Sequence, residues 1–245
     1  MSHKYPPVQG GGSMIVAWQV RDKHVLVVGG GEVWSTHVLP QKVAAGRILH
    51  ALNADAKVTV VCPRSGLNDE VAFRVSEGQV IHVDRTFEPE DLEGADMVLC
   101  AIDDPDASSR VWKLCKEKRI PANIADVPAE CDFYFGSMYR DGPLQVMVST
   151  NGNGPKLASI IRKKIAASLP DNVGAAIENV GKLRKKLREV AARPEEGPKR
   201  MKWMSGVCES WSLEELVKMS EQDMDRLLTH FASGKIPSYN EVHCS

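Results

Sequence analysis

Five short apolar runs stand out in the first half of the chain, each rich in β-branched residues and almost free of polar alternation. Strands that are buried on both faces of a parallel sheet have this composition, because helices cover the sheet on either side. The runs therefore predict five parallel strands, at residues 24–29, 57–62, 79–84, 97–102 and 121–125.

Segments with helical periodicity lie between these runs. One spans residues 45–54 and another spans residues 105–119. Asp104 and Pro105 form a start signal for the second, since aspartate caps free N–H groups and proline fits the first helical turn. The alternation of strand and helix predicts an α/β fold with a Rossmann-type parallel sheet.

The pattern changes in the second half of the chain. Two extended runs, residues 131–138 and 144–150, flank the turn signal Asp141-Gly142 and predict a β-hairpin. From Lys156 onward the pattern is almost entirely helical. We therefore expect a small α+β segment followed by a helical C-terminal region.

The longest helical pattern covers residues 177–190 and contains the basic run "KLRKKLR" at 182–188, which is typical of a solvated face. A capping-box pattern at 212–215 and a further start signal at 220–223 predict later helix starts. The apolar residues expected on the buried face of the long helix are Ile177, Val180, Leu183, Leu187 and Val190.

These changes of pattern divide the chain into four parts. We expect a flexible leader at residues 1–19 and a nucleotide-binding Rossmann-type domain at 20–126. A dimerisation and substrate segment is expected at 127–168, and a helical C-terminal domain at 169–245.

Composition narrows the class of protein. The chain has 245 residues and a formal net charge of −1, so no general basic field points to a nucleic-acid partner. No apolar run approaches the length of a membrane span, and the N-terminus lacks a signal-peptide pattern. The six cysteines are scattered without a CxxC pair, and the seven histidines form no metal-binding spacing. Free thiols in a reducing, cytoplasmic compartment and no protein metal site are expected.

The glycine cluster at the end of the first strand is the first chemical signal. Gly29, Gly30 and Gly31 would let backbone N–H groups approach a pyrophosphate, as in dinucleotide-binding turns. The fingerprint is incomplete, because Trp34 occupies a position that needs a small residue. The second strand also ends without an acid, and Arg64 there could instead favour a 2′-phosphate, which leaves NAD and NADP open.

Several consecutive motifs identify a more specific relationship. The stretches "VLVVGGGEV", "ADAKVTVVCP", "NIADVPAECDFYFG" and "STNGNGPK" resemble the sirohaem-synthesis family of precorrin-2 dehydrogenases and sirohydrochlorin ferrochelatases, including its bifunctional fungal members. The resemblance extends from about Val20 to Pro170.

The resemblance draws attention to the segment "WSTHVLPQKV" at residues 34–43, since the family pattern continues directly from "GGGEV" to "AAGRIL". We favour a gene-model artefact or a tolerated extra loop as the explanation of this segment. The alternative explanation is a regulatory loop that lies over the cofactor. If it is present in the protein, Pro40 keeps it out of the following helix and it bulges beside the pyrophosphate.

The resemblance implies a two-step reaction that produces sirohaem. Precorrin-2 is oxidised with NAD as cofactor to sirohydrochlorin, and Fe²⁺ then enters as a substrate. It implies Asp126 as the catalytic residue for both steps, at the end of the fifth strand, with Asp132 as a second candidate. Two alternatives are open: a dehydrogenase without chelatase activity, and a non-catalytic protein that binds NAD(P) or a tetrapyrrole.

The other expected site residues fall into two sets. Residues near the cofactor are Gly29, Gly30, Gly31, Glu32, Val33, Cys62, Pro63, Ala101, Ile102, Asp103 and Asn123.

The substrate carries eight carboxylates, so hydrogen-bond donors and cations are needed around it. The residues expected there are Ser137, Ser149, Asn151, Gly152 and Lys156, with Thr150 and Arg162 as possible additions. The family also forms homodimers, and a homodimer is expected here.

Overall fold

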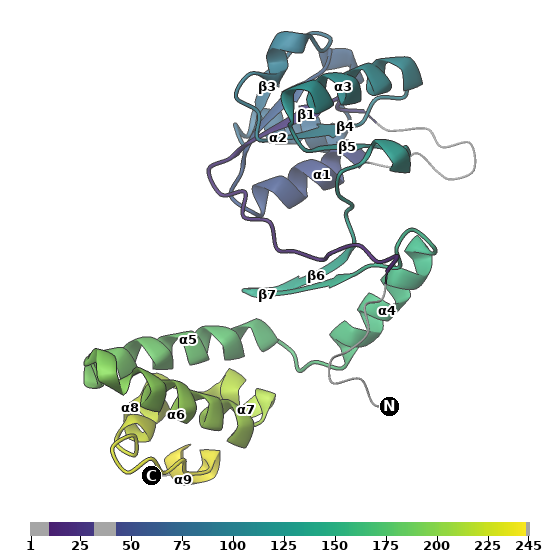
Figure 1. The fold of residues 1–245 in the computed structure, drawn as a ribbon. Helices are drawn as coiled ribbons and strands as arrows, with labels where there is room; N and C mark the ends of the chain where they lie inside the picture. Colours follow the sequence, from purple (N-terminus) through teal and green to yellow (C-terminus); the bar gives the residue numbers. More distant parts are fainter. Residues whose placement is uncertain (1–9, 32–42, 244–245) are drawn as a thin grey trace. The chain divides into compact units, whose positions relative to one another are not determined.

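The N-terminal sheet has the predicted Rossmann-type architecture. A computed structural model describes residues 10–31 and 43–243, and all five strands of its main sheet are parallel, in the order β3-β2-β1-β4-β5 (Figure 1). The chain crosses over between β3 and β4, so the two halves of the sheet are wound in opposite directions from β1. The strands are β1 His24–Val28, β2 Lys57–Val61, β3 Ile81–Val83, β4 Met97–Cys100 and β5 Ala122–Ile124.

Alternating residues of β1 explain why helices cover both faces of this sheet. Val25 and Val27 are fully buried in a cluster with Ile48 of α1, Val43–Leu52. Leu26 and Val28 are buried in a second cluster with Val111 and Cys115 of α3, Pro105–Lys118. Successive side chains of a strand point to opposite faces, so the uninterrupted apolar run is required by a sheet with two covered faces.

The predicted cap of α3 is present. Asp104 Oδ1 accepts hydrogen bonds from the backbone N–H groups of Asp106 at 3.0 Å and Ala107 at 3.1 Å. A further helix, α2 Asp69–Ser76, was not expected from the sequence, although Val71 and Val75, one turn apart, pack in the same core cluster. Asn68 caps this helix by accepting from the N–H of Val71 at 2.9 Å.

The hairpin is present, but its first strand begins later in the chain than predicted. Strand β6 is Ser137–Asp141 and pairs antiparallel with β7, Leu144–Val148. The expectation that the first strand covers residues 131–138 is wrong, and the turn lies at Gly142-Pro143 rather than Asp141-Gly142. Asp141 is the last residue of β6, and its carboxylate accepts a hydrogen bond from the N–H of Gly174 at 3.1 Å.

The rest of the chain is helical, as predicted. The capping boxes at Ser212 and Ser220 are both present. The helices within residues 173–243 share a core that includes Leu183, Leu187 and Trp211. The helices are α4 Pro155–Ala167, α5 Val173–Val190, α6 Gly197–Ser210, α7 Leu213–Lys218, α8 Glu221–Leu228 and α9 Tyr239–His243 (Figure 1).

The buried face of α5 differs from the prediction at its two ends. Leu183 and Leu187 are fully buried, whereas Ile177 is 42% exposed and Val190 is 64% exposed. Ala176 and Ala191, which adjoin these two exposed residues, belong to the core, so the core extends along the helix and the two exposed side chains are not directed into it.

The described residues form two compact units, one comprising 13–135 and the other comprising 136–243 with 10–12. Each unit is considered by itself below. The predicted boundaries at residues 126 and 168 stay predictions. None of the described helices is both long enough and apolar enough to cross a membrane.

Candidate functional site

The glycine turn that follows β1 packs tightly against the loop that follows β4. Gly29 has a φ of +93°, and a Cβ added to it would lie 2.2 Å from the carbonyl oxygen of Ala101. Its backbone N–H donates to the carbonyl oxygen of Val61 at 3.0 Å. This position therefore needs glycine for two reasons, and the turn places backbone rather than side chains at the carboxyl edge of the sheet.

Gly30 has a similar constraint against the end of β2. A Cβ there would lie 2.7 Å from Cys62 Sγ and 2.7 Å from Leu67 Cδ2. Burial raises the pKa of the Cys62 thiol to about 11, so Cys62 contributes packing rather than a reactive thiolate. Gly31 is the last described residue before a gap, and Glu32 and Val33, which were expected to bind the cofactor, lie outside the described residues.

The loops after β2 and β4 complete this edge. Pro63 precedes a single 3₁₀ turn, Arg64–Gly66, and after β4 Ala101 is buried, Ile102 half-buried and Asp103 exposed. The backbone N–H of Ala101 donates to Val28 at 2.8 Å, which fixes the loop beside the glycine turn. The structure thus brings together the described residues of the expected cofactor set that come from β1, β2 and β4.

Asn123 connects this edge to β5. It is 4% exposed, and its Nδ2 donates to the carbonyl oxygen of Phe133 at 2.7 Å. Its Oδ1 is buried and accepts no hydrogen bond from any described residue. A buried acceptor without a donor is uncommon in proteins, and it indicates that a donor from outside the described chain belongs there.

Asp126 lies just beyond β5 and is exposed. Its φ is +58°, in the left-handed region, where aspartate is tolerated better than most residues. The preceding residue, Ala125, is buried and its N–H donates to Cys100 at 2.9 Å. The strand end is thereby held by the sheet, while the Asp126 side chain is exposed at its edge.

Asp132, the second candidate, has a structural role. Its Oδ2 accepts from the backbone N–H of Ala122 at 3.0 Å, and Oδ1 pairs with Lys116. Burial acts to raise the pKa of this carboxyl, but the hydrogen bonds from Lys116 and Ala122 lower it overall. Both oxygens are therefore used to hold β5, which favours Asp126 for chemistry.

Arg47 was missed by the sequence analysis. It lies on α1, and its Nη1 donates to the carbonyl oxygens of Cys100 at 2.6 Å and Asn123 at 3.4 Å. Burial lowers the pKa of its guanidinium overall, although electrostatic interactions with nearby groups, including Asp126, act to raise this pKa. The guanidinium also lies 5.9 Å from the centre of the Phe135 ring. Arg47 thus joins the ends of β4 and β5 next to the candidate acid.

Replacing Arg47 with methionine tests this bridging role. Arg47→Met keeps the aliphatic stem but leaves two carbonyl groups without their donor, so we expect a loss of about 1–3 kcal/mol of stability. Arg21→Met is the control, because its ion pair with Asp55 is exposed, at 75% and 62% of the two side chains, and should contribute less than about 1 kcal/mol. Urea unfolding measures both, and equal losses would contradict the role.

The expected substrate residues lie in the other unit, around the hairpin and the start of α4. Ser137 Oγ accepts a hydrogen bond from Arg162 Nε at 3.1 Å. The expected substrate residue Ser137 therefore orients Arg162, which was named as a possible further substrate contact. Ser149 Oγ accepts from the N–H of Asn151 at 3.1 Å. Asn151 and Gly152 have φ values of +54° and +82°, and form a tight turn before α4.

This turn leads directly into the first turn of α4. Thr150 Oγ1 accepts from the N–H of Gly154 at 3.2 Å, and Lys156 is exposed in the first helical turn. A helix start with an exposed cation is suited to an anionic group. Among residues 10–31 and 43–243, no three His, Cys, Asp or Glu side chains gather in a way that could hold a metal ion.

Family models match almost the whole of the chain in three consecutive segments. A putative NAD(P)-binding model matches residues 16–137, the sirohaem biosynthesis protein central model matches 141–168, and the C-terminal model matches 170–237. The fission yeast Schizosaccharomyces pombe protein "Siroheme biosynthesis protein met8" is 56% identical over 99% of this chain and 88% of its own length. The chain belongs to the sirohaem biosynthesis protein family.

Bacterial relatives are more distant and much longer. "Siroheme synthase" of Thioalkalivibrio sulfidiphilus is 34% identical over 90% of this chain but only 44% of its own length. The Methylobacillus flagellatus protein of the same name is 35% identical over 64% of this chain and 31% of its own length. The chain therefore spans less than half of these two bacterial proteins.

A solved structure agrees with the fold. "SirC, precorrin-2 dehydrogenase" has a TM-score of 0.67 with 18% sequence identity, and covers 90% of this chain and 100% of its own. The putative NAD(P)-binding model over residues 16–137 supports a nicotinamide cofactor. The residues present fit such a group, since Asn123 Oδ1 is buried and accepts no hydrogen bond from a described residue. The expected family, fold class and role in sirohaem biosynthesis are thus confirmed.

Proposed function

We propose that this member of the sirohaem biosynthesis family oxidises precorrin-2 to sirohydrochlorin with NAD⁺ and then inserts Fe²⁺ to give sirohaem. The observation that carries the proposal is the position of Asp126, an exposed carboxylate just after β5, at the same sheet edge as the glycine turn. Ligands of open parallel sheets bind beyond the carboxyl ends of the strands. The 56% identity to a siroheme biosynthesis protein supports the same conclusion.

One acidic side chain suffices for proton transfer in both steps. Oxidation removes a hydride and a proton from the macrocycle, and metal insertion releases two pyrrole protons as Fe²⁺ replaces them. The bound nicotinamide supplies the hydride acceptor. Asp126 receives protons as a general base, and Arg47, which bridges Cys100 and Asn123, keeps the neighbouring strand ends in position.

The cofactor is NAD rather than NADP in this proposal. The Arg64 side chain, which could attract a 2′-phosphate, is near Asp84, with 3.6 Å between Nε and Oδ2. Asp84 also accepts from the backbone N–H of Arg64 at 2.7 Å. A 2′-phosphate beside Arg64 would meet this carboxylate, which disfavours NADP. Comparing Kd for NAD⁺ and NADP⁺ tests the preference, and tighter NADP⁺ binding would overturn it.

The second unit is proposed to provide the dimer interface and the anionic-substrate contacts. Large apolar side chains of α4 are exposed, with Leu157 at 55%, Ile160 at 43% and Ile161 at 38%. An apolar patch beside an open two-stranded sheet is typical of a surface that a second copy covers. Ser137, Ser149, Asn151, Gly152 and Lys156 then contact the substrate carboxylates. Sedimentation of the purified protein tests the dimer, and a monomer at all concentrations would contradict it.

The two steps can be tested separately with the purified protein. Precorrin-2, NAD⁺ and Fe²⁺ are added together and the visible spectrum is followed; we expect sirohydrochlorin and then sirohaem. In a second reaction, sirohydrochlorin and Co²⁺ or Fe²⁺ are incubated without NAD⁺. Metal insertion in the second reaction supports a chelatase. Oxidation of precorrin-2 in the first reaction, with no metal insertion in either, would show a dehydrogenase only.

The free thiols Cys62, Cys100 and Cys115 are buried and agree with a cytosolic location.

A further inference from the structure

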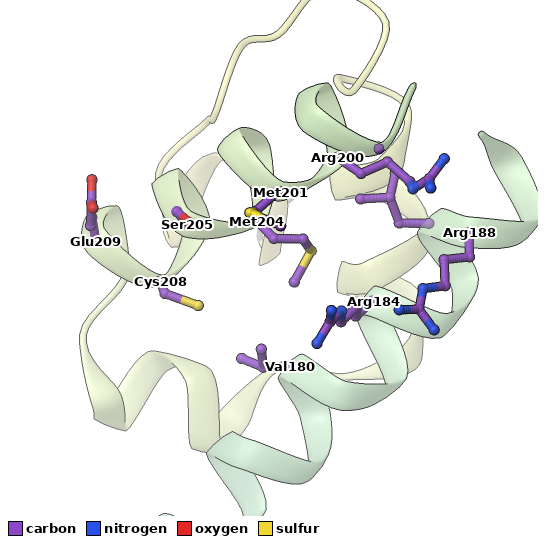
Figure 2. A pocket seen from close by; sticks show the side chains of 11 residues that line it. Val180, Arg184, Arg188, Arg200, Met201, Met204, Ser205, Cys208 and Glu209 are labelled. Carbon is purple, nitrogen blue, oxygen red and sulfur yellow. The ribbon is translucent and has the colours of Figure 1, made fainter. Parts of the chain in front are cut away.

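A hollow in the C-terminal helical region is lined by none of the site residues assigned above. It has a volume of about 740 Å³ and is formed mainly by side chains of α5 and α6 (Figure 2). This volume lies within the range of small-molecule sites. Neither the glycine turn nor the hairpin contributes to it.

Three arginines line this hollow. Arg184 and Arg188 are one turn apart on α5, and Arg200 comes from α6. In Figure 2 the three come from one side, whereas Glu209, the only acidic residue of the lining, lies at the opposite side. The guanidinium of Arg200 is held by the carbonyl oxygens of Ala191 at 2.5 Å and Arg193 at 2.8 Å. One side of the hollow is therefore strongly cationic.

The two arginines of α5 differ from their neighbour in the same basic run. Lys186 forms ion pairs with Glu221 at 2.8 Å and Asp225 at 2.6 Å. Within the part of the chain that the structure describes, no ion pair or hydrogen bond joins the guanidinium groups of Arg184 and Arg188 to another side chain. Like charges four residues apart destabilise a helix slightly, and a bound anion would remove this repulsion. Arg184 and Arg188 are exposed, as expected for a solvated face, and they also line this hollow.

The remaining lining is largely apolar. Leu187 and Met204 are buried, while Met201 is 69% exposed although it lines the hollow. Methionine side chains are flexible and polarizable, so they adapt well to a flat ring. Val180 and Cys208 extend this surface along both helices. The hollow thus combines an apolar floor with guanidinium groups on one side.

We propose that this hollow is a second binding site for a tetrapyrrole polycarboxylate, separate from the catalytic edge. The apolar residues contact the face of the macrocycle, and Arg184 and Arg188 pair with its peripheral carboxylates. Arginine is suited to this because its guanidinium can donate two hydrogen bonds to one carboxylate. The proposal rests on the proposed function for the identity of the ligand. Such a site would keep a reactive macrocycle on the protein before or after the reaction.

The test counts bound tetrapyrroles per chain. Uroporphyrin, which carries eight carboxylates, and its iron complex are titrated separately into the full-length protein by equilibrium dialysis. The variant is Arg184→Glu with Arg188→Glu, and we expect binding at the hollow to weaken at least roughly tenfold. The control is Lys182→Glu with Lys185→Glu, which makes the same change of charge on exposed positions of the same helix outside the hollow.

The number bound separates the possible outcomes. Two tetrapyrroles per wild-type chain, one for the arginine variant and two for the lysine control support the proposal. One for wild type and none for the arginine variant also supports it, and would mean that the proposed function fails at the catalytic edge. One for all three proteins overturns the second site while leaving the proposed function intact. An equal loss in both variants overturns it as well, because general charge would explain the binding.

Discussion

Asp126→Asn is expected to reduce both precorrin-2 oxidation and metal insertion by about 10²–10⁴-fold, the range typical of losing a general base. The amide cannot accept a proton at neutral pH, whereas its shape is nearly that of the carboxylate. Asparagine also tolerates the left-handed φ of +58° that this residue adopts. The fold should therefore be retained, and the melting temperature should change little.

A nearby aspartate provides the matched control. Asp132→Ala removes the acceptor for the buried N–H of Ala122 and the partner of Lys116, so it should lower stability by about 1–3 kcal/mol. Its turnover per folded molecule should remain close to that of the wild type. Steady-state rates and thermal unfolding of both variants decide between these roles. Normal turnover in Asp126→Asn would remove the proposed base.

The sheet was predictable because its physical cause is local. Both faces of β1 require apolar residues, and the short apolar sequence of this five-residue strand shows the requirement directly. The glycine turn was predictable because three consecutive glycines directly follow an apolar run, although the atoms that leave no room for a Cβ at Gly29 belong to the distant Ala101 and Ile102. Helix α2 was missed because it is short, with one fully buried residue, Val71, in eight.

The parts that were missed depend on contacts between distant segments. Arg47 looks like an ordinary helical arginine, and only the packing of α1 against the sheet brings it to the ends of β4 and β5. The hollow beside the basic run at residues 182–188 could not be predicted for the same reason, because the arginines of the run line it only after α6 packs against α5. In the hairpin, the turn signal was one residue out of place, since Asp141 is used as the end of β6 and as a hydrogen-bond acceptor for Gly174.

The second large effect is expected at the glycine turn. Gly29→Ala should destabilise the protein by roughly 2–6 kcal/mol, combining about 1–3 kcal/mol of backbone strain with about 1–3 kcal/mol of overpacking. The new methyl group would lie 2.2 Å from the carbonyl oxygen of Ala101, which is backbone and cannot move without shifting the end of β4. That shift would also displace the loop expected to bind the cofactor, so NAD⁺ binding should weaken at least tenfold.

Gly46→Ala is the matched control for this prediction. Gly46 lies within α1, and a Cβ added there meets no atom within 4 Å. Because alanine favours a helix over glycine, this change should stabilise the protein by about 0.5–1 kcal/mol and leave NAD⁺ affinity unchanged. Urea unfolding and calorimetric titration with NAD⁺ measure the two variants. If Gly29→Ala retained full stability and affinity, the turn could not be packed against Ala101 as described, and the cofactor would need a different place on the sheet edge.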